Sequence, residues 1–523
     1  MRLPAPAPIP ALVAGLLAAA PGLASAQGHE TAFAATRDPV SQGIVAVIIV
    51  LVFAVLARET AHRVLVIFGS VSLLWLITYL TPYHLLPFEA AHRSLDLNVI
   101  LLLAAMMAVV GVLKQTGVFD WAVGRLLDRS GGQPVTLLVL IVWFTAVLSS
   151  MMDNVTTVIF VTPMALEIAR RASIPPVALL LPMVMASNIG GTATLIGDPP
   201  NILIGSGAGL SFLDFIKNLT VPVLWMVVAS AAFSRRYFRR ELAGARPTGL
   251  GGDAPRIHQP VLLKWSLVIS GFIFLGFLTH TLTGMPAAVP AAIGAAAILI
   301  VQDAIYLRTN RPSAAERLHG ILHVIEKEIE WPTLAFFAFL FMTVGAAVET
   351  GLIDTMAGGL SSFIHWGSAT FALSPTGTLL FACMMILWVS GVLSGLIDNI
   401  PFVAVAIPII ARLTGELTGD VEALWWALSL GACLGGNGTP IGASANVTVT
   451  GLAERAGTHV TFGEFLRFGA STAAITLLIA SGFLVAHLYF GMWPTFVVGG
   501  AGVAVVILIQ AVRGRRRPLT VDR

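Results

Sequence analysis

Apolar segments about as long as a membrane-spanning helix follow one another along most of the chain. A transmembrane helix needs about 20 predominantly apolar residues. Segments of this kind lie near residues 41–57, 64–82, 97–115, 177–205, 218–234, 265–282, 286–306, 332–348, 424–450, 470–490 and 494–512. The pattern predicts an all-α polytopic membrane protein with about eleven spans embedded in a lipid bilayer.

Two further apolar pieces, 134–171 and 375–412, are interrupted by polar residues near their middles. Clusters of basic residues separate the spans, and positively charged loops mark the cytoplasmic side. The clusters lie at 58–63, 235–240, 308–327 and 513–517. All four fall on the cytoplasmic side if the mature chain begins outside, each span crosses once, and both interrupted pieces enter and return on one side. The arginines therefore predict two re-entrant hairpins and a cytoplasmic C-terminus.

The first 26 residues resemble a secretory signal peptide, with a basic start, an apolar core at 9–20 and a cleavage pattern ending at Ala26. The alternative is an uncleaved first helix interrupted by Pro21 and Gly22. We expect the mature protein in the plasma membrane of a bacterium, with its N-terminus outside. The expected layout is a signal peptide at 1–26, a first repeat at 41–240, a cytoplasmic linker at 241–264, a second repeat at 265–490, and a terminal transmembrane helix with a basic tail at 491–523.

An internal repeat links the two halves of the chain. A shift of 245 positions places NIGGTATLIGDPPN (188–201) on CLGGNGTPIGASAN (433–446), and LSSMMDN (148–154) on LSGLIDN (393–399). The matched residues are Gly190-Gly191 with Gly435-Gly436, Thr194 with Thr439, Gly197 with Gly442, and Asn201 with Asn446. Because each half has an odd number of spans, the two copies insert in opposite orientations. Inverted repeats of this kind are typical of secondary transporters, with a site at the membrane midplane between them.

The Gly- and Pro-rich centres of 177–205 and 424–450 predict broken helices. In a helix interior Gly is disfavoured by about 1 kcal/mol and Pro by about 3 kcal/mol. A break in hydrocarbon leaves backbone groups unpaired at several kcal/mol each, unless protein or a water-filled cavity surrounds it. Freed N–H groups can then meet an anion, and freed carbonyls a cation. A packing kink is the alternative, but two matched breaks favour a binding site.

Composition supports the membrane assignment and excludes other classes. Hydrophobic residues make up 57% of the chain and charged residues 11%, with a mean hydropathy of +0.88, whereas soluble domains carry about 25% charged residues. The net charge of +3 is spread over topology signals, so nucleic acid is not an expected partner. Without a GxxxxGK[ST] motif, ATP is not expected either. The two cysteines have no CxxC spacing, and we expect no cofactor beyond a coupling ion, H⁺ or Na⁺.

Asp153 and Asp398 stand at the middles of the two hairpins. A carboxylate at the bilayer centre is disfavoured by at least about 2.5–3.5 kcal/mol. No Lys or Arg lies in the apolar part of either hairpin to pair with it, which leaves a proton or a cation such as Na⁺. The alternative is that each aspartate caps a helix N-terminus, and both roles can hold together. Candidate Na⁺ ligands are Asp153, Asn154, Asp398 and Asn399.

The breaks supply further candidate ligands. Asp198 occurs in the first break only, where Ala443 is its counterpart, and is either an extra cation ligand or a turn residue. Hard cations prefer oxygen ligands. Side chains with suitable oxygens are Thr156, Asn188, Thr192, Thr194, Asn201, Asn437, Thr439, Ser444 and Asn446. Glycines that let the backbone approach an ion are Gly190, Gly191, Gly197, Gly435, Gly436 and Gly442. Asp214 and Glu464, after each broken helix, read as interfacial cap residues.

The paired motifs carry a family resemblance. SSMMDNVTTVIFVTP with NIGGTATLIGDPPN, and LSGLIDNIPFVAVAIP with GACLGGNGTPIGASANVTVTGLAE, resemble the ion transporter superfamily. The most similar branch holds arsenite permeases, NhaD-type Na⁺/H⁺ antiporters and pink-eyed dilution (P) proteins, with a citrate transporter-like domain. The resemblance covers roughly residues 41–490. It implies a homodimeric, inverted-repeat fold with a scaffold part and a transport part.

The resemblance also bears on the hairpin tips. In the related divalent anion:sodium symporters, Ser-Asn-Thr motifs at the tips bind the substrate carboxylate and help hold sodium. The matching positions here are 153–156, Asp-Asn-Val-Thr, and 398–401, Asp-Asn-Ile-Pro. Asn is kept, Asp replaces Ser, and the second tip lacks the Thr hydroxyl. These departures leave recognition of a dicarboxylate open.

These observations favour an ion-coupled secondary transporter that moves a small ion by alternating access, and not an enzyme. One alternative is an anion carrier for arsenite, citrate or another di- or tricarboxylate, in which the aspartates bind only the co-ion. Another is a channel with the same fold. A remote alternative is an intramembrane aspartyl protease, because Gly197-Asp198 matches part of a GxGD motif. Residue 195 is Leu, however, so the first glycine of that motif is missing.

Overall fold

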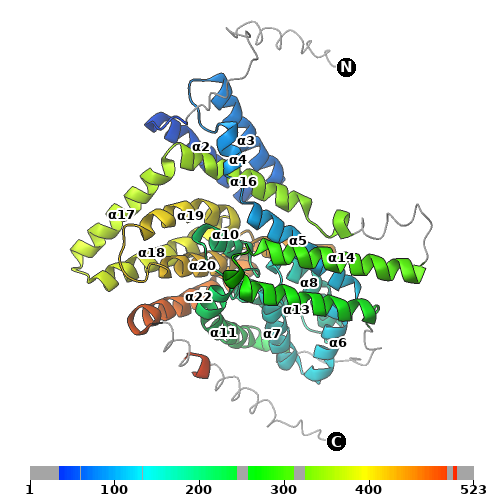
Figure 1. The fold of residues 1–523 in the computed structure, drawn as a ribbon. Helices are drawn as coiled ribbons and strands as arrows, with labels where there is room; N and C mark the ends of the chain where they lie inside the picture. The colour runs from blue at the N-terminus through cyan, green and yellow to red at the C-terminus, as the bar shows by residue number, and fades with distance from the viewer. Residues whose placement is uncertain are drawn as a thin grey trace, which may run out of the picture. The chain divides into compact units, whose positions relative to one another are not determined.

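The computed structural model describes residues 35–58, 61–131, 133–243, 257–310, 324–491 and 499–502, and these ranges are helical with short connections and no strand (Figure 1). The expected signal peptide, most of the linker, most of the expected span at 494–512 and the basic tail lie outside these ranges.

Helices of the first half follow the expected order. They are α2 (Pro39–Arg58), α3 (Arg63–Leu80), α4 (Phe88–Arg93), α5 (Leu97–Gln115), α6 (Val118–Ser130), α7 (Pro134–Met151), α8 (Asn154–Arg171), α9 (Val177–Gly191), α10 (Pro199–Ala208), α11 (Phe212–Tyr237) and α12 (Arg239–Ala243). Helices of the second half are α13 (Pro260–Thr283), α14 (Ala288–Asn310), α16 (Trp331–Glu349), α17 (Leu352–Thr370), α18 (Pro375–Leu396), α19 (Asn399–Thr414), α20 (Ala423–Gly435), the 3₁₀ turn η1 (Gly436–Gly438), α21 (Ser444–Arg455) and α22 (Phe462–Phe490).

Ten helices in the described ranges are long and apolar enough to cross a membrane. They include α7 and α18, the first arms of the two hairpins. The two broken spans are not among them, because each is divided into shorter helices. The predicted all-α membrane fold with two hairpins and two broken helices is therefore confirmed.

The interruptions fall where the polar residues are. Only two residues separate α7 from α8, and two separate α18 from α19, so each hairpin turns at its aspartate. The broken helices leave 192–198 and 439–443 outside regular helix. Some helices run further than predicted: α11 and α22 begin several residues early, because Ser211 with Asp214 and Thr461 with Glu464 form capping boxes. The prediction of Asp214 and Glu464 as cap residues is thus confirmed.

Matched positions of the two repeats have the same local geometry. Gly190 of α9 packs on the backbone of Ala146 in α7, and Gly435 of α20 packs on the backbone of Gly391 in α18. Both pairs are related by the shift of 245. A Cβ on either glycine would overlap backbone atoms of the facing helix, so the packing of each broken helix on its hairpin requires glycine there.

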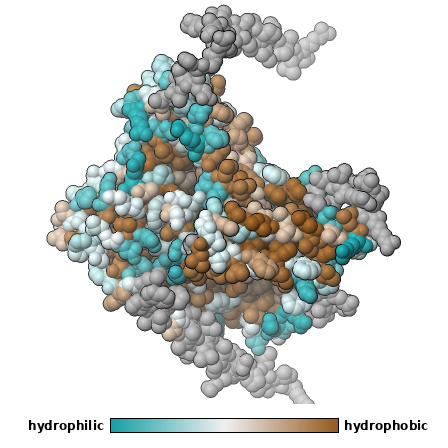
Figure 2. Space-filling view, in the orientation of Figure 1, coloured by the Kyte–Doolittle hydropathy of each residue, from teal (hydrophilic) through white to brown (hydrophobic). Residues whose placement is uncertain are grey.

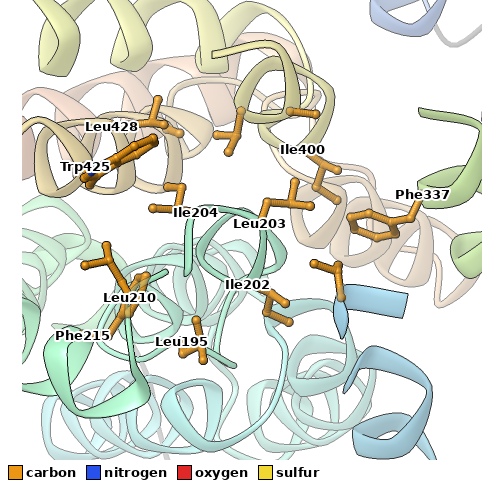
Figure 3. Packing of buried hydrophobic residues seen from close by; sticks show 14 of the residues in the cluster. Leu195, Ile202, Leu203, Ile204, Leu210, Phe215, Phe337, Ile400, Trp425 and Leu428 are labelled. Atoms are coloured by element: carbon orange, nitrogen blue, oxygen red, sulfur yellow. The ribbon is translucent and has the colours of Figure 1, made fainter. Parts of the chain in front are cut away.

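The two repeats cross over each other. Helix α10 of the first repeat packs on α19, in the hairpin of the second repeat. Helix α21 of the second repeat packs on α8, in the hairpin of the first. Figure 3 shows the apolar side of this crossing, where side chains of α10 lie among side chains of α16, α19 and α20; they include Ile202, Leu203, Ile204, Phe337, Ile400, Trp425 and Leu428. Each repeat therefore supplies the covering layer for the other.

Apolar side chains are also exposed on the outside of the helices. Figure 2 shows an apolar surface on the side of the molecule where Figure 1 places α13 and α14. Exposed residues of these helices include Phe272, Leu275, Leu278, Ile293 and Ile300. Soluble monomers rarely expose a contiguous apolar patch of more than a few hundred Å². This surface is suited to contact with lipid chains.

A buried histidine ties one connecting segment to α22. His487 is 5% exposed, and its Nε2 lies 3.0 Å from Oδ2 of Asp420, in the connection between α19 and α20. This hydrogen bond holds the pKa of Asp420 below its ordinary value.

We expect Asp420→Asn to lower the melting temperature by about one or two degrees at pH 7. The effect is small because the carboxyl of Asp420 is half-exposed, and hydrogen bonds and ion pairs of exposed groups add little to the free energy of unfolding. Since the folded pKa is the lower one, the carboxylate contributes stability above about pH 4 and loses that contribution as the pH falls through its lowered pKa. Melting curves of wild type and variant should therefore converge below about pH 4. The control is Glu454→Gln, which removes an exposed carboxylate 3.8 Å from His459. An undiminished difference at pH 3 would contradict the assignment.

Candidate functional site

Both tip aspartates cap the helix that follows them. Oδ1 of Asp153 accepts a hydrogen bond from the N–H of Thr156 at 2.8 Å, and its Oδ2 accepts from the Thr156 hydroxyl. Oδ1 of Asp398 accepts from the N–H of Ile400 at 3.1 Å. Both carboxylates are half-buried. The capping role foreseen as an alternative is therefore present at both tips.

A cluster of amides joins the two repeats. Nδ2 of Asn154 donates to Oδ1 of Asn188 and to Oδ1 of Asp198, both at 3.1 Å. Nδ2 of Asn188 in turn donates to Oδ1 of Asn437 at 2.9 Å and to Oδ1 of Asn446 at 3.0 Å. Asn188 is fully buried and belongs to the first broken helix, whereas Asn437 and Asn446 belong to the second. The first hairpin tip and both broken helices thus meet in one buried polar cluster.

Two matched asparagines hold the freed carbonyls of the breaks. Asn201 donates to the carbonyl oxygens of Thr192 and Thr194 at 3.1 and 2.9 Å. Asn446 donates to those of Gly436 and Thr439, both at 2.8 Å. Each amide replaces backbone hydrogen bonds that an unbroken helix would make. The carbonyls are held in a fixed arrangement and keep a second lone pair for a ligand.

The threonines and glycines of the breaks make close internal contacts. The hydroxyls of Thr194 and Thr439 donate to the carbonyls of Ser150 and Gly395 at 2.6 Å, which fastens each break to its hairpin. A Cβ on Gly197 would lie 2.8 Å from the Cα of Gly191, and one on Gly442 would lie 3.1 Å from the Cα of Gly436. The glycines therefore allow each break to fold back on itself.

Asp198 lies at the centre of this cluster and is fully buried. The carboxylates of Asp153 and Asp398 are near enough to interact with it electrostatically, and the side chains of Asn399 and Cys433 lie beside it. None of the ion pairs in the described ranges includes any of these three aspartates. A buried carboxylate without a paired base favours a proton or a bound cation.

Several buried polar atoms of the cluster have no partner within hydrogen-bond distance. They are Oδ2 of Asp198, Oδ1 of Asn154, Nδ2 of Asn399 and Nδ2 of Asn437. Buried polar groups without a protein partner are unusual, and these four atoms can therefore serve as donors or acceptors for a bound ligand. Among the described residues no group of three His, Cys, Asp or Glu side chains is placed to hold a metal. A cation here would therefore depend on amide and carbonyl oxygens as well as on carboxylates.

One residue of the site escaped sequence reasoning. Nη1 of Arg63, at the start of α3, donates to the hydroxyl of Ser444 at 2.7 Å, and that hydroxyl donates to Oδ2 of Asp398 at 2.8 Å. In the sequence, Arg63 belongs to a basic cluster that indicates membrane orientation. It lies 381 positions away from Ser444, so no local pattern connects the two residues. The inference that only a proton or a metal cation is left to compensate Asp398 is corrected here, because Arg63 lies one hydroxyl group away.

A cavity of about 230 Å³ opens beside this chain of hydrogen bonds. Arg63, Asp398, Ser444 and Thr448 are among its polar lining residues, and Leu56 and Phe336 are among its apolar ones. The cavity therefore combines charged and hydroxyl groups with apolar side chains.

Matched hairpins and broken helices that meet in a buried polar cluster, within a helical body that exposes apolar side chains, define a multi-pass membrane transporter with inverted repeats. The model of the citrate transporter family matches residues 45–431, so the chain belongs to that family.

Proteins of similar sequence support this assignment. A Mycobacterium bovis protein named "Uncharacterized transporter Mb2703" is 35% identical over 444 residues, which cover 84% of this chain and 96% of that protein. The P protein of Homo sapiens is 28% identical over 519 residues, which cover 84% of this chain and 59% of that protein. Relatives named as transporters point to a protein that is not an enzyme. The resemblance to the branch that contains P proteins is confirmed.

A solved structure has the same overall fold. The Alcanivorax borkumensis YdaH transporter, described as having an unusual topology, aligns with a TM-score of 0.54 over 87% of this chain and 100% of that chain. Sequence identity is 18%, so this likeness concerns the fold alone.

Proposed function

We propose that this protein is a cation-coupled secondary transporter, in which Asp153 and Asp398 take up and release H⁺ or Na⁺ as the site is exposed to each side of the membrane in turn. The observation that carries the proposal is the placement of two capped carboxylates at matched hairpin tips, with the buried Asp198 between the repeats. In a lipid-embedded protein these charges require compensation. Exchange of the compensating cation is a means of coupling its gradient to a substrate.

We propose further that the described conformation presents its site to the cytoplasm. The cavity beside Asp398 lies next to Arg63, whose cluster the positive-inside rule assigns to the cytoplasmic side. A bacterial plasma membrane location, an external mature N-terminus, a cytoplasmic C-terminus and a homodimeric assembly belong to the same proposal.

The test is coupled flux in proteoliposomes, followed with an internal pH dye in the presence and absence of Na⁺. Asp153→Asn and Asp398→Asn should each reduce cation-driven flux to the level of empty liposomes while leaving a folded protein, because Asn caps a helix about as well as Asp.

Asp96→Asn is the matched control. Asp96 caps α5, where its Oδ1 accepts from the N–H of Val99 at 3.2 Å, and it lies outside the site. This variant should transport like the wild type. Wild-type flux in both tip variants would remove the coupling role from the aspartates.

A second candidate function is carriage of an organic anion such as citrate or another di- or tricarboxylate, driven by the same cation. It is favoured by the family to which the chain belongs and by the guanidinium of Arg63 beside the cavity. Addition of citrate to the proteoliposome assay separates the two candidates. Citrate-dependent charge or proton movement supports the second, and cation exchange without any anion supports the first.

A further inference from the structure

We propose that the two pseudo-equivalent half-sites have diverged, so that the first repeat offers the cation an additional carboxylate, Asp198, while the second repeat, with Arg63, binds an anionic substrate in the cavity beside Ser444 when Asp398 is neutralised. This inference rests on the proposed function and assigns a position for the anion to the second half-site. It begins from two positions at which the repeats differ.

The repeats differ at the start of the helix that follows each break. The shift of 245 places Asp198 on Ala443 and Pro199 on Ser444. Backbone geometry at the first pair is nearly the same, with φ and ψ of −143° and 130° at Asp198 and of −149° and 143° at Ala443. The first break therefore offers a carboxylate at this position, and the second offers a hydroxyl at the position that follows it.

Arg63 adds a positive charge to the second half-site only. Its guanidinium contacts Ser444 and lines the cavity, whereas the polar contacts of Asp198 come from the hairpin tips and Cys433. A guanidinium has five N–H donors, and one contact with Ser444 leaves donors for a carboxylate or another oxyanion. Helix α21 begins at Ser444, and helix N-termini also favour anions. The guanidinium of Arg63 and the N-terminus of α21 thus both favour negative charge in the second half-site.

Ser444 connects anion binding to the state of Asp398. Its hydroxyl accepts a hydrogen bond from Arg63 and donates a hydrogen bond to Oδ2 of Asp398. While Asp398 is charged and empty, it holds Ser444 and repels an anion in the cavity. A proton or Na⁺ on Asp398 removes this repulsion and frees the charge of Arg63 for the anion. The arrangement therefore makes binding of the anion depend on prior neutralisation of Asp398.

The cavity limits the size of the anion. Its volume of about 230 Å³ is below the range of about 300–1,000 Å³ that is usual for drug-sized ligands. Its apolar lining comes from Leu56, Phe336, Pro401, Ile441 and Val447. This combination suits a compact organic oxyanion better than a fully hydrated inorganic one.

The test measures thermal unfolding of the purified full-length protein at pH 7, with citrate, succinate or phosphate as probe anions, in Na⁺ or in N-methylglucamine. Wild type should be stabilised by at least one organic anion, more strongly in Na⁺ or at lower pH. Arg63→Gln should weaken that anion's apparent affinity by about tenfold or more and keep the response to Na⁺ and to pH. Arg63→Lys should be intermediate, because it keeps the charge and loses the planar fork.

Two further variants complete the test. Arg58→Gln removes a nearby exposed charge that does not line the cavity, and should behave as wild type. Asp398→Asn should bind the organic anion without any need for a cation, because its tip is permanently neutral. Unchanged anion affinity in Arg63→Gln, or no anion-dependent stabilisation of the wild type by any probe, would overturn this proposal. Failure of the coupling proposal is a different result, namely cation-driven flux that survives in both tip variants.

Discussion

Gly190→Ala is expected to separate α9 from α7, to lower the melting temperature by several degrees and to abolish transport. The Cβ of alanine would lie 2.5 Å from the Cα and 2.6 Å from the carbonyl carbon of Ala146. Both elements are backbone, so no side chain can rotate away. Overpacking of a core typically destabilises by about 1–3 kcal/mol and occasionally more. Here we expect the upper end of that range.

Two matched substitutions check this interpretation. Gly435→Ala should have a similar effect, because its Cβ would lie 2.5 Å from the Cα of Gly391. Gly482→Ala lies in α22 with open space around it, and should be neutral or stabilising by up to about 1 kcal/mol. Melting curves in detergent and flux in proteoliposomes measure both effects. A Gly190→Ala protein as stable as the Gly482→Ala protein would contradict the close packing of the broken helix.

Asn188→Ala is the second substitution with a large expected effect. It removes three side-chain hydrogen bonds and leaves amide groups of Asn154, Asn437 and Asn446 without those partners in a fully buried place. Each buried polar group left unsatisfied costs about 1–3 kcal/mol. We expect a loss of several kcal/mol in the free energy of unfolding and a loss of Na⁺-dependent stabilisation.

Cys433→Ala provides the internal comparison. Cys433 matches Asn188 under the shift of 245, but its Sγ makes weak sulfur contacts, such as the one at 3.6 Å with Oδ1 of Asn201, in place of amide hydrogen bonds. That oxygen keeps the hydroxyl of Ser429 at 2.6 Å. Cys433→Ala should therefore reduce the melting temperature far less than Asn188→Ala. Equal losses in the two variants would show that packing, and not the amide cluster, determines stability there.

Much of the fold is predictable from the sequence because its signals are local. Gly, Pro and polar residues inside apolar segments locate the hairpin turns at 152–153 and 397–398 and the breaks after Gly191 and Gly435. A constant shift between the halves then predicts the repeat. The ends of helices are predicted less accurately where a polar cap precedes the apolar run, as at Ser211, because hydropathy alone does not detect a capping box.

The site was predictable only in part. Its asparagines and aspartates stand out as polar residues in apolar surroundings, but their partners do not. Asn188 contacts Asn437 across 249 positions, and Arg63 contacts Ser444 across 381 positions. No periodicity or spacing in one sequence encodes such pairs. The role of Arg63 in the site is also hard to recognise because the positive-inside rule already accounts for a basic residue at the end of a membrane helix.

The reciprocal packing of α10 on α19 and of α21 on α8 has a consequence for biosynthesis. The ribosome completes the first repeat while the helices that cover it are still unmade. Until α20 and α21 emerge, the amides of Asn188 and Asn201 lack their acceptor and donor from the later half. The buried polar cluster of the first half is therefore completed only after most of the second half has been made.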